Sequence, residues 1–291
     1  MKSPRTVPAV IVWKIPDGIR EARLDAGGIH FRYLESGPAT GAARTVLLLH
    51  GFGARSEIWL EVMKELPREW QVVAVDLPCH GLSSQLPGKV RTVPLYLQAL
   101  AAFVEAKMPP HFAIIGSSLG GALGAMLALK YPQRVDKLVL AAASGLTPKL
   151  PGKTVRLYLP YILGAYLFTP TVKKFRSFLA KGVFYDPKFI QEAWLSSLVE
   201  EWRPRAQRMS FLAIAGALRR PDASVSASLG NLKVPTLLLW GKNDAHFDWA
   251  QNEQAAKSIP GSRFVVYDNC GHLPMVEKFR ESLAEVRGFL G

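Results

Sequence analysis

Gly116-Ser117-Ser118-Leu119-Gly120-Gly121 lies between two runs of very different composition. An apolar, β-branched run at 112–115 precedes it, and a run rich in Gly, Ala and Leu follows at 122–130. The first run is typical of a buried strand and the second of a helix, so a sharp turn with Ser118 at its apex is expected. Gly116 and Gly120 have no Cβ to collide with neighbouring backbone, which lets such a turn hold a serine in a strained, exposed conformation.

Strand and helix patterns alternate along most of the chain on both sides of this turn. Apolar runs that predict strands lie at residues 29–34, 45–49, 71–75, 112–115, 137–142, 236–240 and 263–267. Helical spacing of apolar residues is found at 56–66, 94–106, 122–130 and 275–289. Because strands that alternate with helices form a mostly parallel sheet with helices on both faces, we expect an α/β fold.

The alternation stops between residues 145 and 230. This region contains segments with helical patterns, rich in aromatic and basic residues, at 154–168, 172–180, 187–201 and 208–218. A long insertion without strand patterns between two core strands predicts a helical cap, or lid, over one edge of the sheet. We therefore expect a core formed by residues 1–144 and 231–291, and a cap subdomain formed by residues 145–230.

The composition is that of an ordinary globular protein. Of the 291 residues 49% are hydrophobic and 20% charged, enough for one large domain with an insertion. The formal charge is +13, and residues 145–230 hold 13 Lys and Arg against five Asp and Glu, which predicts a basic outer face on the cap. The cations are scattered, without an aromatic-interleaved stripe, so nucleic acid is not an expected partner.

Cysteine usage and hydropathy bear on location. Cys79 and Cys270 are too few for a disulfide framework. The apolar stretch at 7–13 is interrupted by Pro8 and lacks a small-residue cleavage site, so no signal peptide is predicted. No run reaches the ~18–20 apolar residues that span a bilayer, and no His, Cys and carboxylate cluster has metal-ligand spacing. We expect a cytoplasmic protein without metal or cofactor.

Four features lie in loops that follow predicted strands, and the carboxyl ends of parallel strands meet at one edge of a sheet. They are Ser118, the stretch His50-Gly51-Phe52-Gly53, Asp244 and His272. The chain order Ser118, Asp244, His272 is that of the hydrolase version of the serine triad. In such a triad the histidine takes the proton of the serine hydroxyl, and the acid holds the imidazole tautomer.

The supporting groups leave alternatives open. The backbone N–H groups of Phe52 and Leu119 are candidates for an oxyanion hole. Asp248 or Asp268 could replace Asp244 as the acid, although Asp244 follows its strand at the more usual distance. His246 lies too close to Asp244 in the chain to reach across to the serine loop.

The stretch Asp76-Leu77-Pro78-Cys79-His80-Gly81-Leu82-Ser83 resembles the D-x-P-G-x-G-x-S stretch of the α/β-hydrolase superfamily. Cys79 stands where that family usually has glycine. Together with HGFG, GSSLGG, LLLWGKND and NCGHLPMVE, the chain is similar to bacterial carboxylesterases and lipases related to monoacylglycerol lipase. The resemblance implies an eight-stranded α/β-hydrolase fold and ester hydrolysis through an acyl-serine. Carbon–carbon bond hydrolases, thioesterases and lactonases share nearly the same motifs, and a non-catalytic binding homologue is a further alternative.

The cap sequence suggests what the substrate is. Residues 154–168 are apolar and aromatic, and Tyr158, Tyr161 and Tyr166 are candidates to line an acyl pocket. We expect an uncharged small-molecule ester with a short-to-medium acyl chain. The basic flank at Lys173, Lys174 and Arg176 suggests peripheral contact with an anionic membrane as a second use of the cap.

Overall fold

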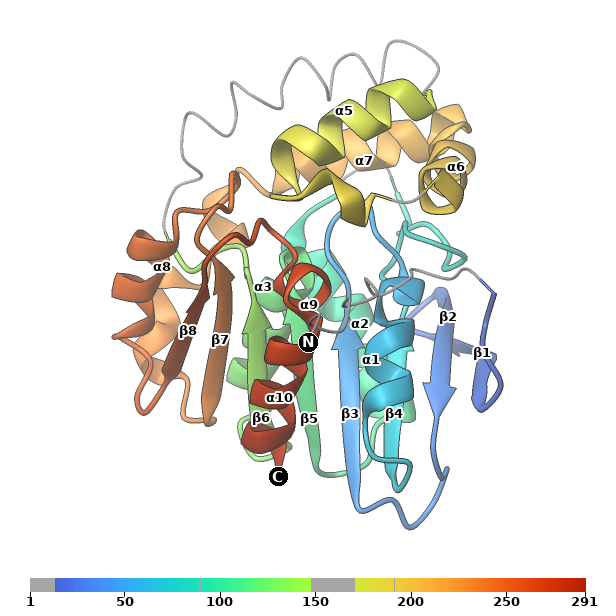
Figure 1. The fold of residues 1–291 in the computed structure, drawn as a ribbon. Coiled ribbons are helices and arrows are strands. Elements are labelled where there is room, and N and C mark those ends of the chain that lie inside the picture. The colour runs from blue at the N-terminus through green and yellow to red at the C-terminus, as the bar shows by residue number, and fades with distance from the viewer. Residues whose placement is uncertain (1–13, 89–90, 148–170, 191) are drawn as a thin grey trace, which may run out of the picture.

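The structure, a computed structural model, describes residues 14–88, 91–147, 171–190 and 192–291. Its eight strands form one sheet in the order β1-β2-β4-β3-β5-β6-β7-β8 (Figure 1). The strands are β1 (Ile19–Ala26), β2 (Ile29–Ser36), β3 (Arg44–Leu49), β4 (Trp70–Val75), β5 (Phe112–Ser117), β6 (Val135–Ala141), β7 (Thr236–Gly241) and β8 (Arg263–Tyr267). β2 is antiparallel to β1 and β4, and every other neighbouring pair is parallel. The predicted mostly parallel sheet is confirmed.

Helices cover both faces of the sheet, which explains the continuous apolar runs of its central strands. In β3, Leu47 and Leu49 face one hydrophobic cluster, and Val46 and Leu48 face the other. Such two-sided burial is what a strand between two helical layers requires. On the first face pack α2 (Val93–Lys107), α3 (Leu119–Lys130) and α8 (Trp249–Ala256), and on the second pack α1 (Leu60–Glu65) and α10 (Phe279–Leu290) (Figure 1).

Two of the predicted core helices are divided in the structure. The prediction at 56–66 corresponds to a 3₁₀ turn η1 (Ser56–Trp59) followed by α1. The prediction of one helix at 275–289 is wrong, because the chain forms α9 (Pro274–Glu277) and then α10. Between them Lys278 leaves the helical region, with φ −120° and ψ 45°. The short α9 packs against β7, and its last residue, Glu277, contacts the loop that precedes it.

The segment between β6 and β7 carries a helical layer beyond the carboxyl ends of the strands (Figure 1). Its described helices are α5 (Val172–Gly182), α6 (Glu192–Trp202) and α7 (Arg205–Ala217), with 3₁₀ turns η2 (Pro187–Phe189), η3 (Pro221–Ala223) and η4 (Ser226–Asn231). The helix predicted at 154–168 lies outside the described residues. Among the helices that the structure describes, none has the length and apolarity needed to cross a lipid bilayer.

Candidate active site

Ser118 occupies the sharp turn between β5 and α3. Its backbone has φ 51° and ψ −115°, a left-handed conformation that costs a non-glycine residue free energy. The turn is possible because backbones meet closely on both sides of it. A Cβ on Gly116 would lie 2.7 Å from the carbonyl carbon of Gly120, and one on Gly120 would lie 2.5 Å from the carbonyl oxygen of His50. The two glycines are therefore required for close approach.

The loop after β3 passes beside the serine. A Cβ on Gly51 would lie 3.1 Å from the Cβ of Ser118 and 3.7 Å from its Oγ. Phe52 follows in the same loop, and Leu119 is the first residue of α3, where a helical N–H group has no acceptor within its helix. The two predicted oxyanion donors thus belong to the two segments that flank Ser118.

The structure brings Asp244 and His272 together at the ends of β7 and β8. His272 Nδ1 and Asp244 Oδ2 are 2.8 Å apart, and the side chains are 7% and 0% exposed. The second oxygen of Asp244 accepts the backbone N–H groups of His246 (2.7 Å) and Phe247 (3.2 Å), which fixes the carboxylate. The histidine therefore lies against a carboxylate that is already oriented.

The two alternative acids have other partners. Asp248 accepts the N–H of Gln251 at 2.9 Å as the N-terminal cap of α8. Asp268 lies on the surface and pairs with Lys242 at 2.8 Å. Of the three candidate acids, the structure places Asp244 on His272.

Two buried histidines near the serine loop are held neutral by burial. His50 Nδ1 lies 2.8 Å from the carbonyl oxygen of Gly51, so Nδ1 carries the proton, and Nε2 accepts the N–H of Leu77 at 2.9 Å. Burial lowers the pKa of His50 to about 4 and that of His80 to about 3. Neither imidazole suits a general base, because His50 has both nitrogens in use and both pKa values lie far below neutrality.

Sequence reasoning missed the position of His246, which lies over His272. Its ring centroid is 4.3 Å from that of His272, and Phe247 lies 5.4 Å from the same ring. Burial, with His272 beside it, lowers the pKa of His246 to about 3. A neutral ring and an apolar ring thus shield the His272–Asp244 pair from water. The sequence signal was only the spacing of two residues from Asp244.

Phe52 makes an aromatic contact that its motif did not reveal. Its ring contacts two aromatic rings of the cap, Trp202 of α6 (6.2 Å between centroids) and Phe211 of α7 (5.4 Å). Trp202 in turn lies 4.2 Å from Phe211 and 5.2 Å from Phe175 of α5. The helical layer between β6 and β7 therefore covers the candidate oxyanion loop with an aromatic roof, which we define as Trp202, Phe211 and Phe175.

Cys79 stands where the D-x-P-G-x-G-x-S stretch has glycine. It has φ 64°, a conformation that glycine adopts without strain. Its side chain is buried, and the Sγ accepts the N–H of Leu86 at 3.3 Å. Cys79 and Cys270 are both free thiols, as expected.

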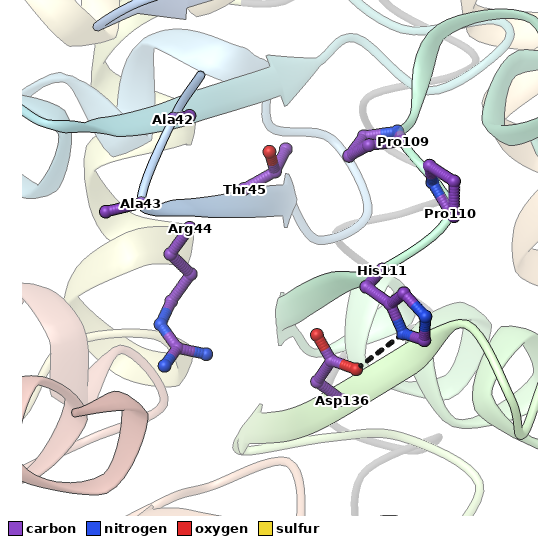
Figure 2. A pocket seen from close by; sticks show the side chains of 8 residues that line it. All are labelled: Ala42, Ala43, Arg44, Thr45, Pro109, Pro110, His111 and Asp136. Atoms are coloured by element: carbon purple, nitrogen blue, oxygen red, sulfur yellow. Dashed lines mark hydrogen bonds and ion pairs between the residues drawn. The ribbon is translucent and has the colours of Figure 1, made fainter. Parts of the chain in front are cut away.

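A hollow of about 420 Å³ lies at the amino ends of the central strands, opposite to the candidate site (Figure 2). It is lined by Ala42, Ala43, Arg44, Thr45, Pro109, Pro110, His111 and Asp136. These residues surround the amino ends of β3, β5 and β6, one strand length from Ser118. His111 and Asp136 are 3.1 Å apart there but are 68% and 42% exposed. The predicted pocket residues Tyr158, Tyr161 and Tyr166 lie outside the described residues.

Comparison with known proteins places this geometry in a family. The profile of the alpha/beta hydrolase fold family matches residues 44–279. Monoacylglycerol lipase ABHD6 of Bos taurus is 29% identical over 260 residues, which cover 86% of this chain and 76% of that protein. Pimeloyl-(acyl-carrier protein) methyl ester esterase of Vibrio parahaemolyticus is 28% identical over 271 residues, which cover 90% and 97%.

Solved structures agree with these relatives. The crystal structure of a membrane phospholipase A, described as a bacterial virulence factor, superimposes with a TM-score of 0.81 at 28% identity. The superposition covers 94% of this chain and 86% of that one. Because the family profile spans most of the sequence and the sheet has the expected topology, the chain belongs to the α/β-hydrolase fold family.

Proposed function

We propose that this protein hydrolyses carboxylic esters through an acyl-serine, with Ser118, His272 and Asp244 as its catalytic triad. One observation carries the proposal: the buried, oriented His272–Asp244 pair lies at the same sheet edge as the strained Ser118. The relatives named as a monoacylglycerol lipase and a methyl ester esterase support an ester as the bond that is cleaved.

In the proposed mechanism the Ser118 Oγ attacks the ester carbonyl carbon while His272 Nε2 takes its proton. The backbone N–H groups of Phe52 and Leu119 stabilise the negative oxygen of the tetrahedral intermediate. The intermediate collapses when His272 gives the proton to the departing alkoxide oxygen. A water molecule then attacks the acyl-serine, His272 accepts one of its protons and returns it to Ser118, and the carboxylic acid leaves. Asp244 stabilises the imidazolium in each step.

The aromatic roof is an argument for a substrate with an apolar acyl chain. Each methylene that leaves water contributes ~0.8 kcal/mol to binding, so activity is expected to rise from short to medium chains. Residues 145–230 are proposed to act as the cap subdomain over a core of residues 1–144 and 231–291. Shortening Tyr158, Tyr161 or Tyr166 to Ala should shift the preferred chain length if these side chains line the acyl pocket.

The site of action is also a proposal. Both cysteines are buried free thiols, which suits the reducing cytoplasm. Peripheral contact with a membrane through the basic flank of α5 is compatible with that location.

The test is hydrolysis of 4-nitrophenyl butyrate and octanoate by the wild type, Ser118→Ala and Ser117→Ala. Ser117 is the matched control, since it is the neighbouring serine at the end of β5. We expect Ser118→Ala to lower kcat on the order of 10⁶-fold and Ser117→Ala to retain most activity. Equal activity of Ser118→Ala and wild type would remove Ser118 from the mechanism.

A substrate panel separates the alternatives. Ester turnover should exceed turnover of a thioester, a lactone and a ring-cleavage dienoate of similar size. Preference for the dienoate would indicate a carbon–carbon bond hydrolase. A fluorophosphonate probe should label Ser118 covalently, and a folded protein that neither labels nor turns over any substrate would be a binding homologue.

A further inference from the structure

A single carboxylate joins the histidine loop to the cap. Glu277, the last residue of α9, is buried. Its Oε1 accepts the backbone N–H of Gly271 at 2.7 Å, directly before His272. Its Oε2 accepts the N–H groups of Tyr185 (2.9 Å) and Asp186 (3.1 Å), which follow α5 in the cap.

The same cap segment, residues 183–186, also contacts the base loop directly. The backbone N–H of His272 donates to the carbonyl oxygen of Val183 at 2.7 Å. A Cβ on Gly271 would lie 2.5 Å from that oxygen and 2.7 Å from the backbone nitrogen of Tyr185. Only glycine permits this approach, so the two backbones meet with no side chain between them.

The carboxylate form of Glu277 fits its surroundings. Burial raises its pKa, while the three N–H donors act in the opposite direction. Oε2 accepts two hydrogen bonds and Oε1 accepts one, so a proton on Oε2 would displace a donor from the cap segment. Replacement by an amide would have a similar effect, since one oxygen becomes an NH₂ group that faces an N–H donor.

We propose that Glu277 is a positioning residue for His272, and that through it the cap segment 183–186 helps to hold the base. The inference rests on the proposed triad. Glu277 accepts hydrogen bonds from the base loop through one oxygen and from the cap through the other, so loss of its charge leaves at least one of these N–H groups without an acceptor. It also follows that the cap is fixed at this end, because lifting residues 183–186 would move His272.

The proposal predicts a signature that loss of folded protein does not produce. His272 must give a proton to an alkoxide leaving group, whereas 4-nitrophenolate leaves without one. A misplaced His272 should therefore damage turnover of methyl octanoate more than turnover of 4-nitrophenyl octanoate. Misplacement of a catalytic group by about 1 Å costs roughly 10²-fold in rate.

The experiment compares Glu277→Gln with Glu281→Gln, a matched change at an exposed carboxylate in the first turn of α10. For Glu277→Gln we expect kcat to fall about 100-fold on methyl octanoate and about 10-fold on 4-nitrophenyl octanoate, with KM nearly unchanged. Glu281→Gln should behave as the wild type. If Glu277→Gln does not fold, Glu277→Asp, which keeps the acceptors on a shorter side chain, is measured for the same ratio of losses.

Each outcome decides between the two proposals. Equal losses on both esters, in proportion to the folded fraction, would reduce Glu277 to a structural role and overturn this inference. Unchanged rates in Glu277→Gln would do the same and leave the triad intact. A wild type that neither hydrolyses esters nor labels at Ser118 with a fluorophosphonate would instead overturn the proposed function itself.

Discussion

The parallel sheet carries a histidine–aspartate pair at the carboxyl ends of its strands and another at their amino ends. The two pairs have similar distances but differ in burial. His272 and Asp244 are 2.8 Å apart, and His111 and Asp136 are 3.1 Å apart. The first pair is almost completely buried, whereas His111 is 68% exposed. Water and salt screen an exposed pair, which contributes little. Burial and fixed neighbours, rather than a short contact, distinguish a pair that can support catalysis.

Replacement of the aspartate of each pair by asparagine should produce the largest difference in kcat between the two ends of the strands. Asp244→Asn removes the charge that stabilises imidazolium and favours the wrong tautomer, so kcat should fall about 10⁴-fold. Asp136→Asn, the same change at the hollow, should leave kcat and KM within twofold. The measurement is steady-state hydrolysis of 4-nitrophenyl octanoate. Comparable losses of kcat in both variants would contradict the assignment of the active site to the carboxyl ends of the strands.

Acid should destabilise the protein through its buried histidines. In the unfolded chain a histidine titrates near pH 6.5, whereas in the folded protein the pKa of His80 is lowered to about 3. The unfolded state therefore binds more protons between these values. The free energy of unfolding should fall as pH drops below about 6, by up to ~1.4 kcal/mol per pH unit for each such histidine.

Urea unfolding at pH 7, 6 and 5 measures this slope. His80→Gln should make the fall with pH shallower by about one proton. An unchanged slope in His80→Gln would mean that this imidazole takes up a proton in the folded state as easily as in the unfolded chain.

Two glycines with positive φ allow the effect of backbone strain to be compared beside the site and beside the hollow. Gly53 beside the site and Gly41 beside the hollow have φ 71° and 69°. Alanine at either position should cost about 1–2 kcal/mol of unfolding free energy. At Gly53 the added Cβ would also lie 3.2 Å from Trp202, whereas at Gly41 no described atom lies within 4 Å. Only Gly53→Ala should therefore lower kcat/KM, by several-fold. Thermal unfolding measures the loss of stability in both variants, and ester hydrolysis measures kcat/KM.

The smallest expected effect concerns the surface of the cap. Lys173 and Lys174 lie in the first turn of α5, on the side of the site rather than of the hollow. If the cap docks on anionic lipid, each lysine contributes about 1 kcal/mol to binding. Co-sedimentation with phosphatidylglycerol vesicles should weaken with salt and in Lys173→Ala and Lys174→Ala. The exposed core lysine variant Lys233→Ala should bind as the wild type, and equal binding by all variants would argue against the dock.

Most of the sheet could be predicted because its central strands are apolar on both sides. β1 had no such signal, since IREARLDA exposes much of its length at the sheet edge. The break at Lys278 also escaped prediction, because the apolar spacing of 275–289 continues across it. Local patterns report burial well, and they report changes of chain direction poorly.

The parts of the site that depend on contacts distant in sequence could not be predicted. Ser118, Asp244 and His272 follow strands in a recognisable order. Glu277 ends the quoted stretch NCGHLPMVE, but its partners in the segment after α5 lie more than 90 positions away, and the stretch does not indicate them. The contact of Phe52 with the aromatic roof likewise depends on how the cap packs on the core.

Because the cap lies between β6 and β7, the residues of the proposed site are synthesised in two stages, before and after the cap. The first six strands occupy contiguous positions in the sheet, so they can pair before the rest of the chain is made. They already include Ser118 and the loop beside it. Asp244 and His272 follow only after the cap, with β7 and β8 added at one edge. A growing chain therefore presents the proposed nucleophile without its base, and the proposed triad is complete only in a late step, when the last strand docks.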